Sequence, residues 1–301
     1  MKDVNGKTAF ITGGASGVGF GMAHAFLNAG MNVAIADIRG DHLDAAKKEL
    51  QEISDGVHAI QVDITDREAM AAAADATEER FGKVHMLCNN AGINVFGPIE
   101  QANYDDWDWI MDVNLNSVFT GIKCFLPKIQ AHGEGGHIVN TASMASIVSG
   151  PGAGIYTAAK AGVRGLTECL WYGLVPQGIG VSLVCPGLVA SNINLSEEIR
   201  PDARADTGYA PDQEWTDRLA IVQKMGMEPI EIGQKILRGI LNDDLYILTH
   251  PDHKEEVARD FAEILDAFPD EPVDADRLEV EKGRRKMKYD IKDKFMKRNG
   301  L

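Results

Sequence analysis

Long apolar runs, an excess of basic residues and paired cysteines are all missing from this sequence. No run approaches the ~20 apolar residues that cross a bilayer, and no N-terminal apolar segment with a cleavage site is present. The 30 Lys and Arg residues are outnumbered by 45 Asp and Glu, so the net charge is −15. A nucleic-acid binder carries a basic patch. We therefore expect a cytoplasmic protein that binds neither membranes nor nucleic acid.

The sequence also offers few candidate metal ligands. Four cysteines without paired spacing are present, at Cys88, Cys124, Cys169 and Cys185. All but Cys124 lie in apolar segments, which is typical of core thiols and not of disulfides or ligands. His250 and His253 form a close pair, and the proline between them favours a loop over a metal site. We predict no metal site.

Strands and helices are predicted to alternate along the 301 residues, of which 45% are hydrophobic and 25% charged. Strand-like segments cover 8–12, 32–37, 57–63, 85–88, 137–142, 180–185 and 245–249. Helix-like segments cover 41–53, 66–81 and 104–130, and further helices follow the first and fifth strands. This alternation predicts an α/β fold, a doubly wound parallel seven-stranded sheet of Rossmann type.

Two segments fall outside that alternation. Residues 188–227 mix turn residues with large apolar ones and are too long for an ordinary connection. We predict that they form a substrate lid within a catalytic domain of residues 1–251, mobile until ligand binds. A flexible surface loop unrelated to catalysis is the alternative. Residues 252–301 are predicted to form a helical extension packed on the same domain. A contact across subunits is the alternative, and the basic run 282–288 is interpreted as a solvated helix face.

A glycine-rich turn follows the first strand. Gly13, Gly17 and Gly19 stand in G-x-x-x-G-x-G spacing between a buried strand and an amphipathic helix. Glycines permit positive φ angles and let backbone N–H groups approach a pyrophosphate at the helix N-terminus. Strand, glycine turn and helix together predict a dinucleotide site.

Tyr156 is the one tyrosine with a lysine four residues later, Lys160. On a helix the two side chains share a face. A nearby ammonium lowers the pKa of a phenol from about 10 toward the range useful for general base catalysis. Ser143 ends the fifth strand and is positioned to hold a substrate oxygen. A surface Tyr/Lys pair is the alternative, and the nucleotide site upstream argues against it.

The chain resembles the short-chain dehydrogenase/reductase family over residues 7–191. The resemblance is carried, in order, by Thr12-Gly13-x-x-x-Gly17-x-Gly19, Asn89-Asn90-Ala91-Gly92, Asn114, Ser143, Tyr156-x-x-x-Lys160 and Pro186-Gly187. It implies Asn114, Ser143, Tyr156 and Lys160 as catalytic residues. It implies a cofactor site of Gly13, Ser16, Gly17, Val18, Gly19, Asp37, Asp63, Ile64, Asn90, Ala91, Gly92, Tyr156, Lys160, Pro186, Gly187, Val189 and Ser191.

Cofactor choice depends on Asp37, which ends the second strand. A carboxylate at that position hydrogen-bonds the ribose hydroxyls of NAD and repels the 2′-phosphate of NADP. Arg39 is a nearby basic residue that weakens this interpretation. Gly14 occupies a loop position where NADP users often carry a basic residue. We predict NAD, with NADP the less favoured alternative.

The resemblance also implies a reaction: Tyr156 takes a hydroxyl proton while a hydride passes to the nicotinamide. Several segments are similar to the aryl Cα-dehydrogenases, namely Gly97-Pro98-Ile99-Glu100, Tyr104-Asp105-Asp106, Ser191-Asn192-Ile193, Thr207-Gly208-Tyr209 and Leu245-Tyr246-Ile247. Candidate substrate contacts are Asn94, Phe96, Ser143, Met144, Leu188, Asn192 and Met225. The lid also carries four basic residues, Arg200, Arg204, Arg218 and Lys224, for which we favour surface charge over contact with an acidic substrate.

We therefore expect an NAD-dependent secondary-alcohol dehydrogenase for a bulky, aromatic substrate, in a homodimer or homotetramer. The alternatives are a ketone reductase for a steroid-like or other biosynthetic carbonyl and a non-catalytic NAD-sensing regulator. Intact Ser143, Tyr156 and Lys160 count against the regulator.

Overall fold

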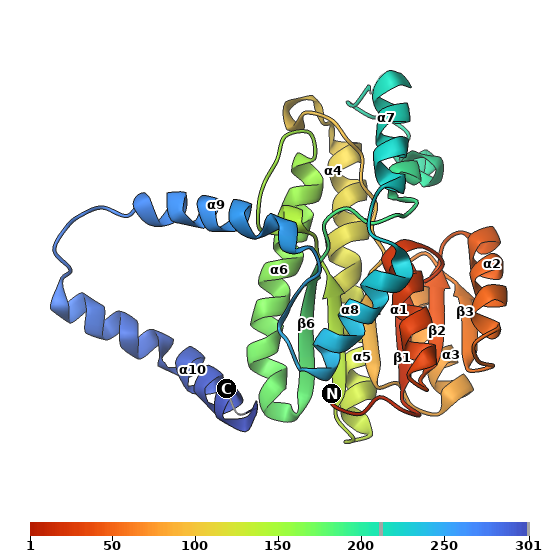
Figure 1. The fold of residues 1–301 in the computed structure, drawn as a ribbon, viewed down its shortest axis with the longest axis horizontal. Coiled ribbons are helices and arrows are strands. Elements are labelled where there is room, and N and C mark those ends of the chain that lie inside the picture. The colour runs from red at the N-terminus through yellow and green to blue at the C-terminus, as the bar shows by residue number, and fades with distance from the viewer. Residues whose placement is uncertain (211–212, 300–301) are drawn as a thin grey trace.

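The structure of the protein, a computed structural model, describes residues 1–210 and 213–299. Seven parallel strands form one sheet in the order β3-β2-β1-β4-β5-β6-β7 (Figure 1). They are β1 (Thr8–Thr12), β2 (Asn32–Asp37), β3 (Val57–Gln61), β4 (Met86–Asn89), β5 (Gly136–Thr141), β6 (Ile179–Cys185) and β7 (Tyr246–Leu248). The predicted doubly wound parallel sheet is confirmed.

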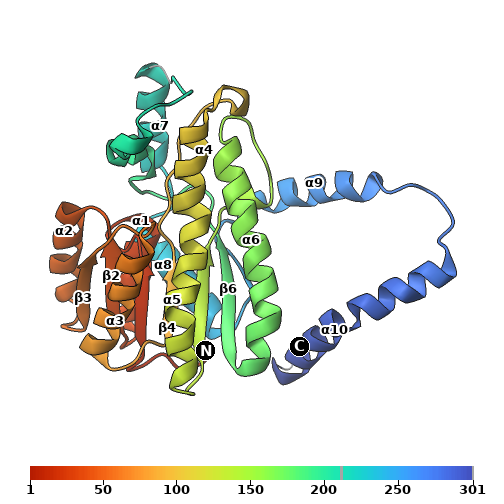
Figure 2. The ribbon, with the colours of Figure 1, turned by 180° about the vertical axis from the view of Figure 1, so that it is seen from behind.

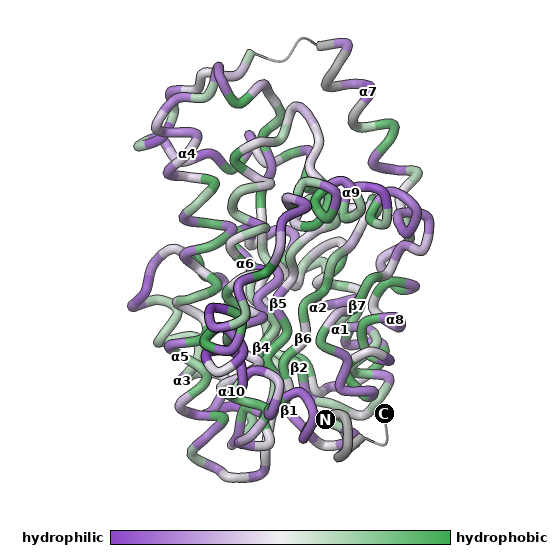
Figure 3. Tube along the Cα trace, turned by 90° about the vertical axis from the view of Figure 1, so that its left-hand side faces the viewer, coloured by the Kyte–Doolittle hydropathy of each residue, from purple (hydrophilic) through white to green (hydrophobic). Residues whose placement is uncertain are grey.

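Helices cover both faces of the sheet. They are α1 (Gly17–Asn28), α2 (Gly40–Gln51), α3 (Arg67–Phe81), α4 (Tyr104–Met111), α5 (Ser117–Ala131), α6 (Gly154–Leu174), α7 (Gln213–Lys224), α8 (Pro229–Leu241), α9 (Lys254–Asp266) and α10 (Ala275–Asn299). Buried side chains of α1, α2 and α8 form the core on one face, and those of α3, α5 and α6 form the core on the other. The apolar segments gather at the sheet between these layers (Figure 3).

The predicted helix over 104–130 is present with one irregularity. A π-helical segment, Asp112–Asn116, joins α4 to α5, so that one long rod runs along the sheet (Figure 2). A π-bulge inserts an extra residue into the helical turn and is frequent at functional sites. Here it contains Asn114, which is fully buried.

Two backbone hydrogen bonds join the two ends of the segment 188–227, the predicted lid. Met227 N donates to Leu188 O at 2.9 Å, and Ala190 N donates to Met227 O at 3.0 Å. Between them lie two 3₁₀ segments, Ile193–Ile199 and Asp202–Arg204, and then α7. Lid residues 211–212 lie outside the described part of the chain.

Two predictions about packing need correction. The extension stands away from the body over most of its length (Figures 1 and 2). Among its described residues, it packs on the core near its two ends, through Val257 and through Ile291 and Phe295. Cys169 is exposed and is not a core thiol, because its side chain lies on the outer face of α6.

No helix in the described residues is both long and apolar enough to cross a bilayer.

Candidate active site

A cavity of about 530 Å³ opens at the carboxyl ends of the strands, where ligands bind in doubly wound sheets. Most residues proposed from the sequence line it: Gly13, Ser16, Gly17, Val18, Asp37, Asp63, Ile64, Asn90, Ala91, Gly92, Asn94, Phe96, Ser143, Tyr156, Lys160, Pro186, Gly187, Leu188, Val189, Ser191 and Asn192. Four do not: Gly19, Asn114, Met144 and Met225. Residues far apart in the chain therefore meet in one site.

The glycine turn leaves room for a bound anion. Gly13 and Gly17 have φ of 64° and 50°, which favour glycine. A Cβ at Gly17 would lie 2.6 Å from the Ser191 Cβ. Ser16 precedes α1, yet its side chain does not cap the helix, and the first turn carries no acidic residue. The backbone N–H groups of this turn thus suit a pyrophosphate, and the residues fit a dinucleotide.

Asp37 faces the same cavity from the end of β2. Its carboxylate accepts hydrogen bonds from Arg39 N at 3.1 Å and from Ala15 N at 3.4 Å. Burial raises the pKa of Asp37, and these N–H groups offset part of the rise. Arg39, the residue that weakened the NAD interpretation, is held by Asp41 at 2.9 Å and by Glu198 of the lid at 3.2 Å. Its charge is already paired with two carboxylates.

Ser143, Tyr156 and Lys160 form the reactive wall of the cavity. The Ser143 hydroxyl lies beside the phenol of Tyr156 and acts to lower its pKa. Lys160 Nζ lies 5.6 Å from the centre of the Tyr156 ring and donates to Thr141 O at 3.0 Å. The side chain of Lys160 is 3% exposed, so its ammonium is held at this point between β5 and α6.

The pKa of Tyr156 differs from the sequence-based expectation. Burial raises it, and the Ser143 hydrogen bond only partly opposes that rise. Burial also lowers the pKa of Lys160 to about 8. Desolvation disfavours both charged forms. In this structure burial therefore outweighs the lowering of the Tyr156 pKa that is expected from a nearby ammonium.

Asn114 lies behind the wall and not on it. Its side chain accepts from Ile93 N at 3.0 Å and donates to Ile93 O at 2.9 Å. A Cβ at Gly92 would lie 2.7 Å from Asn114 Oδ1 and 3.2 Å from Lys160 Nζ. The π-bulge thus brings Asn114 to the strand-β4 loop beside the lysine.

Three other predicted residues also lie off the cavity. Met144 is buried in the core beneath the site, and Met225 is 77% exposed on the lid after α7. We therefore correct both as direct substrate contacts in this conformation. Gly19 packs against the glycine turn, where a Cβ would overlap Gly13 O and Asn90. Its smallness allows the turn to close, which is a packing role.

The apolar end of the cavity contains residues that the sequence did not indicate: Trp109, Val113, Ile193, Leu195, Ile199 and Pro201. Apolar periodicity marks Trp109 as core and offers no signal that it faces a ligand. Among the described residues, two buried polar atoms at the cavity lack a hydrogen-bond partner, Asn94 Oδ1 and Thr141 Oγ1. Such orphaned groups suit a bound polar ligand.

The loop after β6 is held by a histidine that no motif revealed. His250 Nδ1 accepts from Gly187 N at 3.0 Å, and its Nε2 donates to Leu188 O at 3.0 Å. The ring is 9% exposed, and both of its nitrogens are used in these two backbone contacts. His250 is thus a backbone anchor for Gly187 and Leu188, next to residues that the family resemblance assigns to the cofactor site. His253 lines the cavity next to it.

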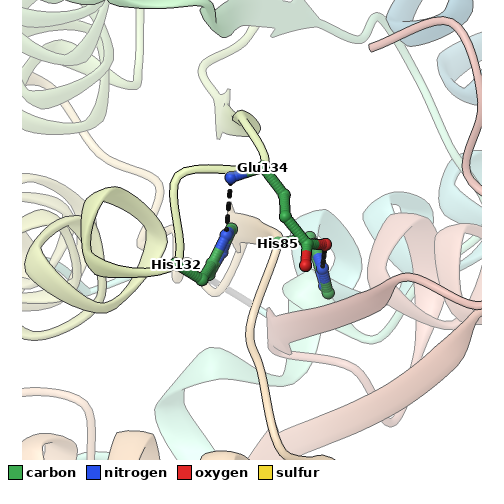
Figure 4. A group of neighbouring side chains, drawn as sticks. All are labelled: His85, His132 and Glu134. Carbon is green, nitrogen blue, oxygen red and sulfur yellow. Dashed lines mark hydrogen bonds and ion pairs between the residues drawn. The ribbon is translucent and has the colours of Figure 1, made fainter.

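A second histidine cluster lies at the opposite ends of the strands (Figure 4). His85, His132 and Glu134 bring three potential ligand atoms within 4.8 Å of one another. Both His132 ring nitrogens already bond to backbone, at Val84 O (2.9 Å) and Glu134 N (3.1 Å). Lys7 and Lys83 also pair with Glu134. We assign the cluster to an ion-pair network, because two adjacent ammonium groups repel a cation.

Comparisons with known proteins agree with this geometry. A model of the short chain dehydrogenase family matches residues 7–202. The chain is 40% identical over 277 residues to a C alpha-dehydrogenase of Sphingobium sp. strain SYK-6, covering 92% of this chain and 90% of that protein.

Two solved structures share the fold. LigO from Sphingobium sp. strain SYK-6, in its apo form, is 39% identical with a TM-score of 0.78, covering 95% of this chain and 98% of that chain. A short-chain dehydrogenase/reductase of Burkholderia phymatum, solved in complex with NAD, is 33% identical with a TM-score of 0.83, covering 91% and 100%.

The anchoring role of His250 is testable by substitution. His250→Ala leaves Gly187 N–H and Leu188 C=O without their partner, so we expect the dissociation constant for NAD to rise about tenfold, the scale of one lost hydrogen bond. His250→Asn retains an acceptor near the Nδ1 position and should recover part of the affinity. Titration calorimetry measures both. Asp252→Asn, an exposed change in the same loop, is the control. Unchanged affinity in His250→Ala would contradict the anchor.

Proposed function

Because the chain belongs to the short-chain dehydrogenase/reductase family, we propose that it oxidises a bulky secondary alcohol, aromatic and benzylic in class, to a ketone with NAD. The observation that carries this proposal is that Tyr156 and Ser143 line one cavity together with the glycine turn and Asp37. The same cavity is lined by the apolar side chains of Phe96 and Trp109. A flat apolar substrate fits against these side chains, and its hydroxyl meets the phenol.

Each reactive side chain then has a distinct task. Ser143 binds the substrate oxygen, and Tyr156 accepts the hydroxyl proton as general base. Lys160 holds a positive charge beside the phenol and stabilises its anion. Asn114 fixes the backbone next to Lys160 through both hydrogen bonds to Ile93. NAD, when bound, supplies the hydride acceptor, and its positive nicotinamide further favours the phenolate.

The apolar end supports an aromatic substrate. It is lined by the aromatic side chains of Trp109 and Phe96 and by Ile199 and Leu195. Aromatic pairs gain about 0.5–1.5 kcal/mol beyond area burial. The C alpha-dehydrogenase of Sphingobium sp. strain SYK-6 is similar over nearly the whole chain, which supports the same class of alcohol.

The proposal is tested by NAD reduction with a panel of benzylic, steroid and aliphatic secondary alcohols. We expect benzylic alcohols to have the highest kcat/KM. Tyr156→Phe should lower turnover about 10²–10⁴-fold, the usual contribution of a general base, with NAD affinity retained. Preference for steroids, or for no alcohol at all, would overturn the proposal.

The rate of oxidation should depend on pH in a defined direction. Oxidation needs the phenolate of Tyr156, so we expect kcat/KM to increase with pH. Burial raises the pKa of this phenol, whereas the positive charges of Lys160 and of bound NAD lower it. With NAD bound we therefore expect a midpoint below the free value of about 10. Lys160→Met should move that midpoint upward by about 1–3 units. Lys160→Arg keeps the charge and should shift it less. A pH-independent rate would exclude Tyr156 as the base.

NAD should be preferred to NADP by about 1–3 kcal/mol in kcat/KM, the scale of one polar discrimination. Asp37→Ala should narrow that preference, because the repelling carboxylate is removed. Asp41→Asn releases one partner of Arg39 and should improve NADP use modestly without weakening NAD. Steady-state kinetics with both cofactors decide the matter. If Asp37→Ala left the ratio unchanged, another residue would control cofactor choice.

A further inference from the structure

A buried carboxylate on α4 organises the lid far from the reactive wall. Asp106 is 0% exposed and accepts four hydrogen bonds. Thr207 Oγ1 (2.8 Å) and Arg200 Nη2 (2.9 Å) donate to Oδ1, and Gly208 N (2.9 Å) and Asn103 N (3.1 Å) donate to Oδ2. These bonds hold the pKa of Asp106 below its usual value although burial opposes its charge. A buried charge is stable only when it is bonded in this way.

Three of these four donors belong to residues 200–209, which we call the lid base. Tyr209 is 4% exposed and packs on Gly97, where a Cβ would overlap its ring. Gly208 lies against the backbone of Gln101, where a Cβ would also overlap. Three segments therefore pack together here: 97–100, 104–106 and 207–209. None of them carries a group that takes part in the proposed reaction.

The lid base also shapes the apolar end of the cavity. The guanidinium of Arg200 lies 4.5 Å from the centre of the Trp109 ring, and Trp109 lines the cavity. Ile199 and Pro201, on either side of Arg200 in the chain, line it too. Arg200 has 6% of its side chain exposed, so it is not available to an acidic substrate. Movement of the lid base would displace this wall of the cavity.

The later part of the lid contains exposed apolar side chains: Ile221 on α7 is 65% exposed, and Met225 beyond it is 77% exposed. Gln223 of α7 donates to Val189 O and, at 3.0 Å, to Ser191 Oγ, so this part is also bonded to the loop after β6. The mobility of the lid without ligand stays a prediction.

We propose that Asp106 is a positioning residue that fixes the lid base and thereby sets the largest substrate the apolar end accepts. This inference rests on the proposed alcohol oxidation. Asp106 touches neither the proposed cofactor site nor the reactive wall, so it acts through Arg200, Thr207 and Gly208. Loss of its charge frees the lid base, and the wall formed by Trp109, Ile199 and Pro201 loses its fixed position.

The test compares Asp106→Asn with wild type on benzylic alcohols of increasing size and on cyclohexanol. In Asp106→Asn we expect kcat/KM for the largest good substrate to fall on the order of 100-fold, the usual cost of a 1 Å misplacement. Most of the loss should appear in KM, and the value for cyclohexanol should change less than about threefold. Affinity for NAD should be unchanged. A size profile equal to that of wild type would overturn the inference.

Hydrogen exchange of peptides covering 200–209 gives a readout independent of activity. Exchange at Gly208 should accelerate in Asp106→Asn, because its N–H loses a charged acceptor. Thr207→Val keeps the shape of the side chain and removes its bond to Asp106, together with the bond that Thr207 Oγ1 accepts from Tyr209 N. It should give the same changes at about 3- to 10-fold, which decides the question if Asp106→Asn does not fold.

Asp108→Asn is the matched control. Asp108 lies on the same helix and pairs with Arg204 of the lid base at 2.6 Å, but its side chain is 45% exposed. Exposed pairs contribute little, so its kinetics and exchange should match wild type. An equal effect in Asp108→Asn would show that the loss of any carboxylate on α4 disturbs the lid base. That result would refute the specific role of Asp106. If the wild-type protein oxidised none of the alcohols, the proposed function would be refuted instead. Hydrogen exchange of residues 200–209 would still test whether Asp106 anchors the lid base.

Discussion

The site depends on the reversal of strand order between β1 and β4. From this point the chain winds in opposite directions, so the following helices cover opposite faces and leave the carboxyl ends of both strands open. Thr12 Oγ1 accepts from Asn90 N (2.9 Å) and Ala91 N (3.0 Å), and the Asn90 amide donates to Thr12 O at 3.0 Å. These bonds join the two strand ends, and a cofactor loop on each is thereby held in register.

Much of the fold and of the cofactor site was predictable because it is encoded locally. Period-2 and continuous apolar segments identify buried strands, and glycine spacing identifies a turn that requires positive φ. The family resemblance pointed to Asn114, but helix periodicity carries no sign of the extra residue that forms the π-bulge there. Trp109 and His250 were not predictable in their roles, because each acts through a partner about 90 or 60 residues away in sequence.

The pairing of Tyr156 with Lys160 shows a different limit. Their i, i+4 spacing correctly places both on one face of α6, and both line the cavity. The direction of a pKa shift, however, depends on burial as well as on neighbouring charge. Burial is the largest cause for both groups: it raises the pKa of Tyr156 and lowers that of Lys160 to about 8, so proximity alone does not stabilise the phenolate. The positive nicotinamide of bound NAD would add to the charge of Lys160 in favouring the phenolate.

Asp106 extends the same logic from the reactive wall to the substrate wall. Acidic residues on a helix surface are ordinarily solvated, and Asp105 and Asp108 follow that rule in pairing with Arg204 near the surface. Asp106 points the other way and is buried, because four donors replace its water. A carboxylate surrounded by fixed donors has few alternative geometries, whereas apolar contacts tolerate sliding. The charge of Asp106 therefore fixes the lid base and, through Arg200, the position of Trp109 in the wall of the apolar end.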